Sequence, residues 1–265
     1  MDLNLQCQSS IDKIQDWILA NRLTLNFEKT CYMLFLPNTY NISLSNFSLT
    51  LTGSPLNRVT KVKYLGVLFD EDLTWDLHIQ ELCLLLRKHV GIFYKLSCTL
   101  PLPVLRMLYF ALIYPRILYG VELYANTYPN HLHALSVLNN RLLRIIQHRD
   151  IRANTLEMYS SFNTLPIDKL FKYQFLLHAH SIFFNSDKMP GLFHYNKLLN
   201  TNIHNYSTRS RLDFHRMSTN SSFGAKVSYI LYSKLWNSLP SHIKSISSYP
   251  IFKKNIRNYL YTNDL

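Results

Sequence analysis

Few residues in this chain have types and spacings that could carry out chemistry. Lys29 follows the string Asn-Phe-Glu at residues 26–28, between a helical and a strand-like segment, where neighbouring strands could aim its compact positive charge at a site. A run of three carboxylates occupies residues 70–72 (DED). Surface acids hold a metal only where several ligands converge, so we expect this run to be a solvated loop. We therefore predict no metal site.

The histidines and glycines point to no known catalytic arrangement. Two pairs, His131 with His133 and His178 with His180, are spaced one residue apart, which on a helix turns the two rings to different faces. No cysteine lies near either pair, so a zinc site is not expected. The six glycines form no Gly-x-Ser-x-Gly, Walker or Gly-x-Gly-x-x-Gly string, which argues against a serine hydrolase, a P-loop and a Rossmann domain.

Basic residues are the remaining candidates, as ligands for phosphate. Arg141 and Arg144 lie three residues apart on a predicted helix and so share a face. Lys253 and Arg257 lie one turn apart on another predicted helix. The expected phosphate contacts are Arg141, Arg144, Arg209, Arg211, Lys253, Lys254 and Arg257. Such contacts give affinity for a polyanion without reading its sequence.

The charge of the chain is uneven along its length. The 265 residues carry a net charge of +12. Residues 1–75 contribute −1, residues 76–190 contribute +5 and residues 191–265 contribute +8. The two basic segments are the ones expected to face a polyanion such as nucleic acid. An acidic protein is the alternative partner, and a solvated basic surface with no partner is equally compatible with the charge alone.

The hydrophobic pattern predicts an α+β fold that is mostly helical. Apolar residues at three- and four-residue steps predict an amphipathic helix over residues 3–20, and short apolar stretches separated by Pro and Gly predict a small antiparallel sheet after it. Residues 48–52 alternate polar and apolar, which predicts a half-buried strand that meets its partner across a turn at Gly53. Residues 76–190 are then expected to form a helical bundle, with one helix over residues 104–119. Residues 191–265 are expected to form a basic tail that closes with two helices.

Nothing in the sequence indicates secretion or a membrane span. The four cysteines are far apart and form no Cys-x-x-Cys pair, which fits a reducing compartment. The longest apolar run, residues 107–114, is far shorter than the ~20 residues of a membrane helix, and no signal-peptide core occurs near the start. We therefore expect an intracellular protein, in the cytoplasm or nucleus, with no membrane partner. The oligomeric state is left open.

Three strings in a fixed order resemble the late palm motifs of reverse transcriptases from LINE-type (non-LTR, jockey-like) retrotransposons. They are residues 23–30 (LTLNFEKT), 64–67 (YLGV) and 73–75 (LTW). Four later strings are similar to the thumb and C-terminal region of the same family: residues 117–122 (ILYGVE), 142–146 (LLRII), 165–167 (LPI) and 235–240 (LWNSLP). Their common order along most of the chain makes the resemblance specific.

The resemblance implies roles for several residues of the first segment. Lys29 matches a lysine that assists the departing pyrophosphate in this family. Tyr64, Leu65 and Gly66 match the tip of the primer-grip hairpin, where a glycine lets the backbone approach the primer. The implied domains are a palm remnant (residues 1–75), a thumb-like helical domain (76–190) and a basic C-terminal region (191–265).

The resemblance also implies what the chain binds and what it lacks. In this family the paired metal-binding aspartates precede the lysine motif, and a helix connects the aspartates to that motif. This chain starts within or just before that helix. Because polymerisation needs two metal ions held by carboxylates, we expect a truncated RNA-directed DNA polymerase that is inactive alone and has no cofactor, with Mg²⁺ needed by the full-length enzyme. The expected partners are RNA or an RNA/DNA duplex, bound without sequence preference. The alternative is a basic helical protein-interaction module with no nucleic-acid function.

Overall fold

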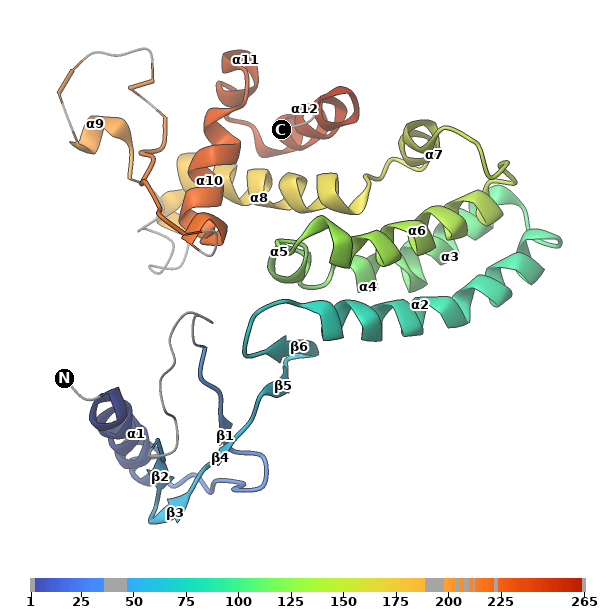
Figure 1. The fold of residues 1–265 in the computed structure, drawn as a ribbon. Coiled ribbons are helices and arrows are strands. Elements are labelled where there is room, and N and C mark those ends of the chain that lie inside the picture. Colours follow the sequence, from blue (N-terminus) through green and yellow to red (C-terminus); the bar gives the residue numbers. More distant parts are fainter. Residues whose placement is uncertain are drawn as a thin grey trace. The chain divides into compact units, whose positions relative to one another are not determined.

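The computed structural model describes residues 3–35, 47–188, 198–203, 205–206, 210–211, 213–221 and 224–263 (Figure 1). The chain divides into two compact units, Met1–His78 and Ile79–Leu265, which we call the first and second units. The predicted α+β, mostly helical fold is confirmed. The finer division at residue 190, between a thumb-like domain and a tail, stays a prediction.

The first unit begins with the predicted helix, α1 (Leu3–Ala20). None of its residues is buried, and Ile14 and Trp17 are 54% and 60% exposed. Polar contacts attach the helix instead. The side-chain amide of Gln8 donates to the backbone oxygen of Thr50 at 2.9 Å and accepts from the N–H of Thr50 at 3.0 Å. One glutamine thus pairs with a strand residue as a neighbouring strand would.

The expected small sheet is present as three separate two-stranded ladders. One ladder, β1 with β4, is parallel and the other two are antiparallel. The pairs are β1 (Cys31–Tyr32) with β4 (Asn57–Arg58), β2 (Thr50–Leu51) with β3 (Ser54–Pro55), and β5 (Lys61–Tyr64) with β6 (Val67–Asp70).

The β2–β3 hairpin follows directly from the sequence pattern. Leu49 and Leu51 are buried while Thr50 and Thr52 are exposed, as expected for a half-buried strand. The turn residues Thr52 and Gly53 both have positive φ, of 51° and 77°, which a two-residue hairpin turn of type I′ requires. The predicted strand and its turn are confirmed.

The second unit is built from helices. α2 (Asp76–Ser97) starts at the end of the first unit and continues into the second. It is followed by α3 (Leu102–Leu112), α4 (Tyr114–Leu118), α5 (Val121–Tyr124), α6 (Pro129–Ile146), α7 (Thr155–Ser161) and α8 (Ile167–Phe184). Among the described segments, none of the helices combines the length and apolarity that a membrane span needs.

The single helix predicted over residues 104–119 is wrong, because the structure has two helices there. α3 ends at Leu112, and α4 begins at Tyr114 with Pro115 in its first turn. Proline has no N–H to donate, and its ring collides with the carbonyl four residues earlier, so a helix ends before it and a new one starts with it.

Two C-terminal helices, α10 (Ser228–Asn237) and α12 (Tyr249–Thr262), complete the core of the second unit by packing on α8 (Figure 1). The same segment also contains the short helices α9 (Asn200–Ile203) and α11 (Ser241–Lys244), and α11 contacts α12. The fully buried ring of Trp236 on α10 stacks on Phe183 of α8, with 5.2 Å between centroids. His180 of α8 stacks on Phe252 of α12 at 4.3 Å. The two predicted closing helices are confirmed, and they are elements of the core.

Candidate nucleic-acid interface

Lys29 lies where the sequence predicts it, in a tight turn between α1 and β1. The carbonyl oxygen of Asn26 accepts a hydrogen bond from the N–H of Thr30 at 3.1 Å, and the Asn26 side chain accepts from the N–H of Lys29 at 3.1 Å. Asparagine favours such turns because its side chain bonds to the backbone that follows it. The side chain of Lys29 is exposed, and its role in releasing pyrophosphate stays a prediction.

The tip of the β5–β6 hairpin presents an aromatic and an apolar side chain to solvent. Tyr64 is 64% exposed and Leu65 is 72% exposed. Leu65 and Gly66 make the two-residue turn, with φ of 46° and 84°. Glycine adopts this conformation freely, whereas leucine is strained in it, and such strain is concentrated at functional sites. The predicted primer contact of these three residues is compatible with this exposure and stays a prediction.

The acidic run at the end of β6 is not the solvated loop that we expected. Asp70 is buried, and its carboxylate accepts from the N–H groups of Thr74 at 2.8 Å and Trp75 at 2.9 Å. Glu71 forms an ion pair with Arg58 at 2.9 Å. The expectation is wrong for Asp70 because the backbone N–H groups just before α2 need an acceptor. This carboxylate fixes the hairpin to the start of α2.

Arg141 and Arg144 on α6 have different surroundings. Arg141 is exposed and has no ion-pair partner among the described residues. Arg144 is half-buried, and its Nε atom is buried with no hydrogen-bond partner among those residues. Burial raises the pKa of the neighbouring Tyr159, while a hydrogen bond with Asn139 and the charge of Arg144 act in the opposite direction. Arg141 is therefore the more open of the two predicted contacts.

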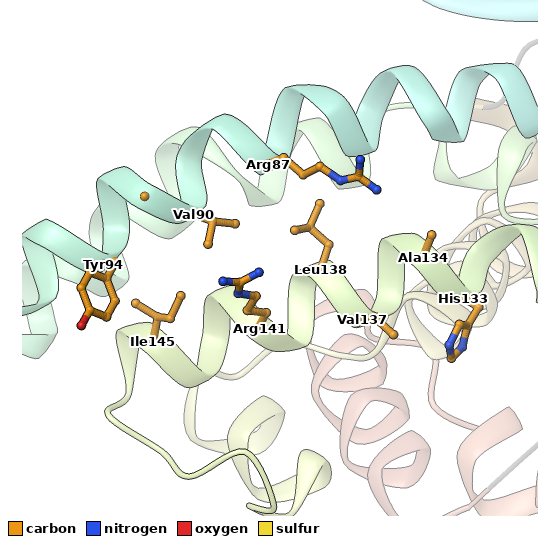
Figure 2. Close-up of a pocket in the computed structure, with 10 residues that line it drawn as sticks. Arg87, Val90, Tyr94, His133, Ala134, Val137, Leu138, Arg141 and Ile145 are labelled. Atoms are coloured by element: carbon orange, nitrogen blue, oxygen red, sulfur yellow. The ribbon is translucent and has the colours of Figure 1, made fainter.

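A groove of about 800 Å³ lies between α2 and α6 (Figure 2). Figure 2 shows Val90 pointing from α2 toward α6, and Leu138 and Arg141 pointing from α6 toward α2. Arg87 on α2 also lines the groove and is exposed, and it too has no ion-pair partner in the described part of the chain. The other lining residues are Gly91, Tyr94, His133, Ala134, Val137 and Ile145. The groove thus joins two arginines to an apolar floor.

The groove residues of α2 were missed in the sequence, although a signal for them exists. Arg87, Gly91 and Tyr94 are spaced four and three residues apart, which places all three on one face of a helix. An arginine, a glycine and a tyrosine on the same face are not an ordinary core stripe. Their partner on the facing helix, Arg141, was predicted on its own.

The basic residues of α12 divide into two kinds. Lys253 and Lys254 are exposed, opposite the buried apolar face of the helix. The guanidinium group of Arg257 is half-buried, and it donates to the side chain of Asn163 at 2.8 Å and to the hydroxyl of Tyr173 at 3.0 Å. Arg257 therefore already has partners inside the second unit. Its contact with nucleic acid stays a prediction, as do those of the two lysines.

The predicted contacts in the polar stretch before α10 are less informative. Arg211 is exposed. Arg209 lies outside the described residues. The exposed predicted cations are thus distributed over α6, α12 and this stretch. In the α2–α6 groove, two arginines without an ion-pair partner among the described residues share one concave surface.

The histidine pairs have no metal-binding arrangement in the described part of the chain, where no three His, Cys, Asp or Glu side chains are grouped to hold a metal ion. His180 is buried, and its Nε2 atom is 2.9 Å from the carbonyl oxygen of Ile246. Burial lowers the pKa of His180, and this hydrogen bond acts in the opposite direction. His180 therefore packs the core, whereas His178 is exposed.

Comparison with known proteins gives two similar sequences. The RNA-directed DNA polymerase from mobile element jockey of Drosophila funebris is 27% identical over 142 residues, which are 52% of this chain and 15% of that protein. The probable RNA-directed DNA polymerase from transposon BS of Drosophila melanogaster is 25% identical over 171 residues, which are 59% of this chain and 19% of that protein. No family model and no solved structure matches the chain.

The matches cover more than half of this chain but less than a fifth of each relative. The resemblance to LINE-type reverse transcriptases is thereby confirmed, since this chain is similar to the RNA-directed DNA polymerases of two mobile elements.

Proposed function

We propose that this chain is a reverse-transcriptase-related polypeptide whose second unit binds RNA or an RNA/DNA duplex without sequence preference. The observation that carries the proposal is the contrast in charge between the two units. Residues 79–265 contain 22 Lys and Arg against 8 Asp and Glu, a net charge of +14, whereas residues 1–78 contain 6 against 8, a net charge of −2. Phosphate contacts from such a surface give affinity that is independent of base sequence.

The exposed cations of the second unit supply the contacts in this proposal. Arg141, Lys253 and Lys254 are exposed on α6 and α12. Arg144, Arg211 and Arg257 are further contacts, and Arg257 would exchange its present hydrogen bonds for phosphate only at a cost. The hairpin tip of the first unit, with Tyr64, adds a contact to the end of a primer, as the resemblance implies.

We also expect the 265-residue polypeptide to extend no primer by itself. Polymerisation requires converging carboxylates that hold two metal ions. Asp70 instead bonds to backbone N–H groups, and Glu71 is paired with Arg58. The expectation is checked by primer extension on an RNA template with Mg²⁺ or Mn²⁺. Template-dependent extension by a preparation free of contaminating polymerase would contradict it.

The binding proposal is tested by competition. A fluorescently labelled RNA/DNA duplex is bound to the protein, and its displacement by unlabelled duplex is compared with displacement by an acidic polypeptide of equal charge. The proposal predicts micromolar or weaker binding of the duplex and displacement at lower concentrations by duplex than by the polypeptide. Stronger displacement by the polypeptide would favour the alternative, a basic helical protein-interaction module.

A further inference from the structure

The groove between α2 and α6 differs from an ordinary basic surface in the position of its two arginines. Arg87 projects from one wall and Arg141 from the other, and the described residues offer neither an ion-pair partner. Two unpaired cations beside a concave apolar surface attract an anionic ligand that also has apolar faces to cover that surface.

Gly91 gives independent evidence that the groove is kept open. It lies in the interior of α2, where glycine is less favourable than almost any other residue. A Cβ atom added to Gly91 would meet no other atom within 4 Å, so internal packing does not require glycine there. Gly91 does line the groove, where a larger side chain would occupy the space. Gly91 therefore leaves room in the groove that a large side chain would fill.

We infer that the α2–α6 groove binds an unpaired, single-stranded stretch of nucleic acid, with phosphates at Arg87 and Arg141 and bases against the apolar floor. The inference rests on the proposed function and names the ligand of one part of the basic unit. A duplex stacks its bases inside and would leave the half-buried Val90 and the exposed Val137 uncovered. Unpaired bases have exposed faces, and Tyr94, which is 64% exposed at one end of the groove, offers a ring for stacking.

The decisive variant fills the groove without changing its charge. Gly91→Leu should lower the affinity for a ten-nucleotide single strand at least fivefold and change the affinity for a blunt RNA/DNA duplex less than twofold. Gly91→Ala is the matched control, because one added methyl group leaves most of the groove open. Circular dichroism and the melting temperature check that both variants are folded.

A second variant removes the charge and leaves the groove open. Arg87→Gln with Arg141→Gln should reduce the slope of log Kd against log salt for the single strand by about 1.4, since each phosphate contact to a single strand contributes about 0.7. Arg149→Gln with Arg152→Gln, at exposed positions that do not line the groove, is the control for a loss of two charges. It should change that slope less.

The outcomes separate the inference from the proposed function. If Gly91→Leu lowers duplex and single-strand binding equally, or changes neither while the wild-type protein binds both, the single-strand site is wrong and the proposed function stands. If a short acidic amphipathic peptide displaces the single strand from the wild-type protein but not from Gly91→Leu, at concentrations below those of an unlabelled strand, the groove is a peptide site. If the wild-type protein binds no nucleic acid, both claims are wrong.

Discussion

The two units of this chain differ in what holds them together. Of the described apolar residues, four are buried in the first unit and forty in the second. The first unit depends on side chains that bond to backbone, such as Gln8 with Thr50 and Asp70 with the N–H groups before α2. The second unit encloses aromatic rings that pack around Trp236. Because apolar burial is the main driving force for folding, we expect the second unit to be the more stable of the two when each is produced alone.

The two units also differ in the kind of functional residue predicted in each. The first unit presents a strained, exposed hairpin tip and an exposed loop lysine, and its net charge is −2. The second unit has a net charge of +14, and most of the proposed phosphate contacts lie on its helices. In the proposed function, the second unit therefore provides most of the affinity for nucleic acid. The first unit adds contacts from its hairpin tip and loop lysine, and it has the smaller apolar core.

The largest expected effect comes from removing the central ring of the second unit. Trp236→Ala should lower its free energy of unfolding by about 3–5 kcal/mol, because the ring is fully buried and its loss leaves a cavity. Trp17→Ala in α1 should change stability by less than about 0.5 kcal/mol, since Trp17 is 60% exposed. Urea unfolding followed by far-ultraviolet circular dichroism measures both. Equal effects would contradict the contrast between the units.

A smaller effect is expected at the polar anchor of the first unit. Asp70→Ala leaves two backbone N–H groups without their acceptor and should cost about 2 kcal/mol locally. Asp72→Ala, at an exposed position, is the control. Hydrogen exchange should show faster exchange of the Thr74 and Trp75 amides in the first variant only. Unchanged protection of these amides would mean that the carboxylate is not the anchor.

The binding contrast is tested by equal charge changes in the two units. Lys253→Glu with Lys254→Glu on α12 should weaken binding of an RNA/DNA duplex about tenfold, or about 1.4 kcal/mol. Lys13→Glu with Arg22→Glu, also exposed, changes the charge of the first unit by the same amount and should weaken binding less than twofold. Fluorescence anisotropy at one salt concentration gives both values. A larger loss from the first-unit pair would reverse the assignment of affinity.

The smallest effect concerns pH and the core of the second unit. Burial holds the pKa of His180 below its ordinary value of 6.5, so the unfolded chain binds a proton more readily than the folded one as the pH falls through that range. Stability should therefore decrease below about pH 6.5 and be unaffected by His180 above it. Removing the titrating group in His180→Gln should flatten this decrease relative to the wild type, whereas His178→Gln should not. Identical pH profiles for wild type and His180→Gln would contradict the assignment.

The parts of the fold that could be predicted are those with a strong local signal. The period of apolar residues located α1, α6 and α12, and the alternation around Leu51 with Gly53 located the β2–β3 hairpin. The break between α3 and α4 was also visible as Pro115, but the apolar run that precedes it, residues 107–114, hid the signal. The burial of Asp70 could not be predicted, because it depends on how the chain turns back before α2.

The site residues that could be predicted are those whose exposure follows from their neighbours in the sequence. Arg141, Lys253 and Lys254 were found as exposed cations from helical spacing. Arg87 was not predicted, because it becomes a candidate only through the groove that it forms with α6, and α6 lies far from it along the chain. Nor does spacing reveal that the guanidinium group of Arg257 is held by Asn163 and Tyr173.

The central claim, sequence-independent electrostatic binding of nucleic acid, is tested most directly by the salt dependence of the wild-type protein. Kd is measured for two RNA/DNA duplexes of unrelated sequence across a range of salt concentrations. The account predicts Kd values for the two duplexes within twofold of each other. It also predicts a linear plot of the logarithm of the association constant against the logarithm of the salt concentration, with a slope steeper than about −3 because each phosphate contact contributes about −0.9. A slope near zero, or binding of only one of the two duplexes, would contradict it.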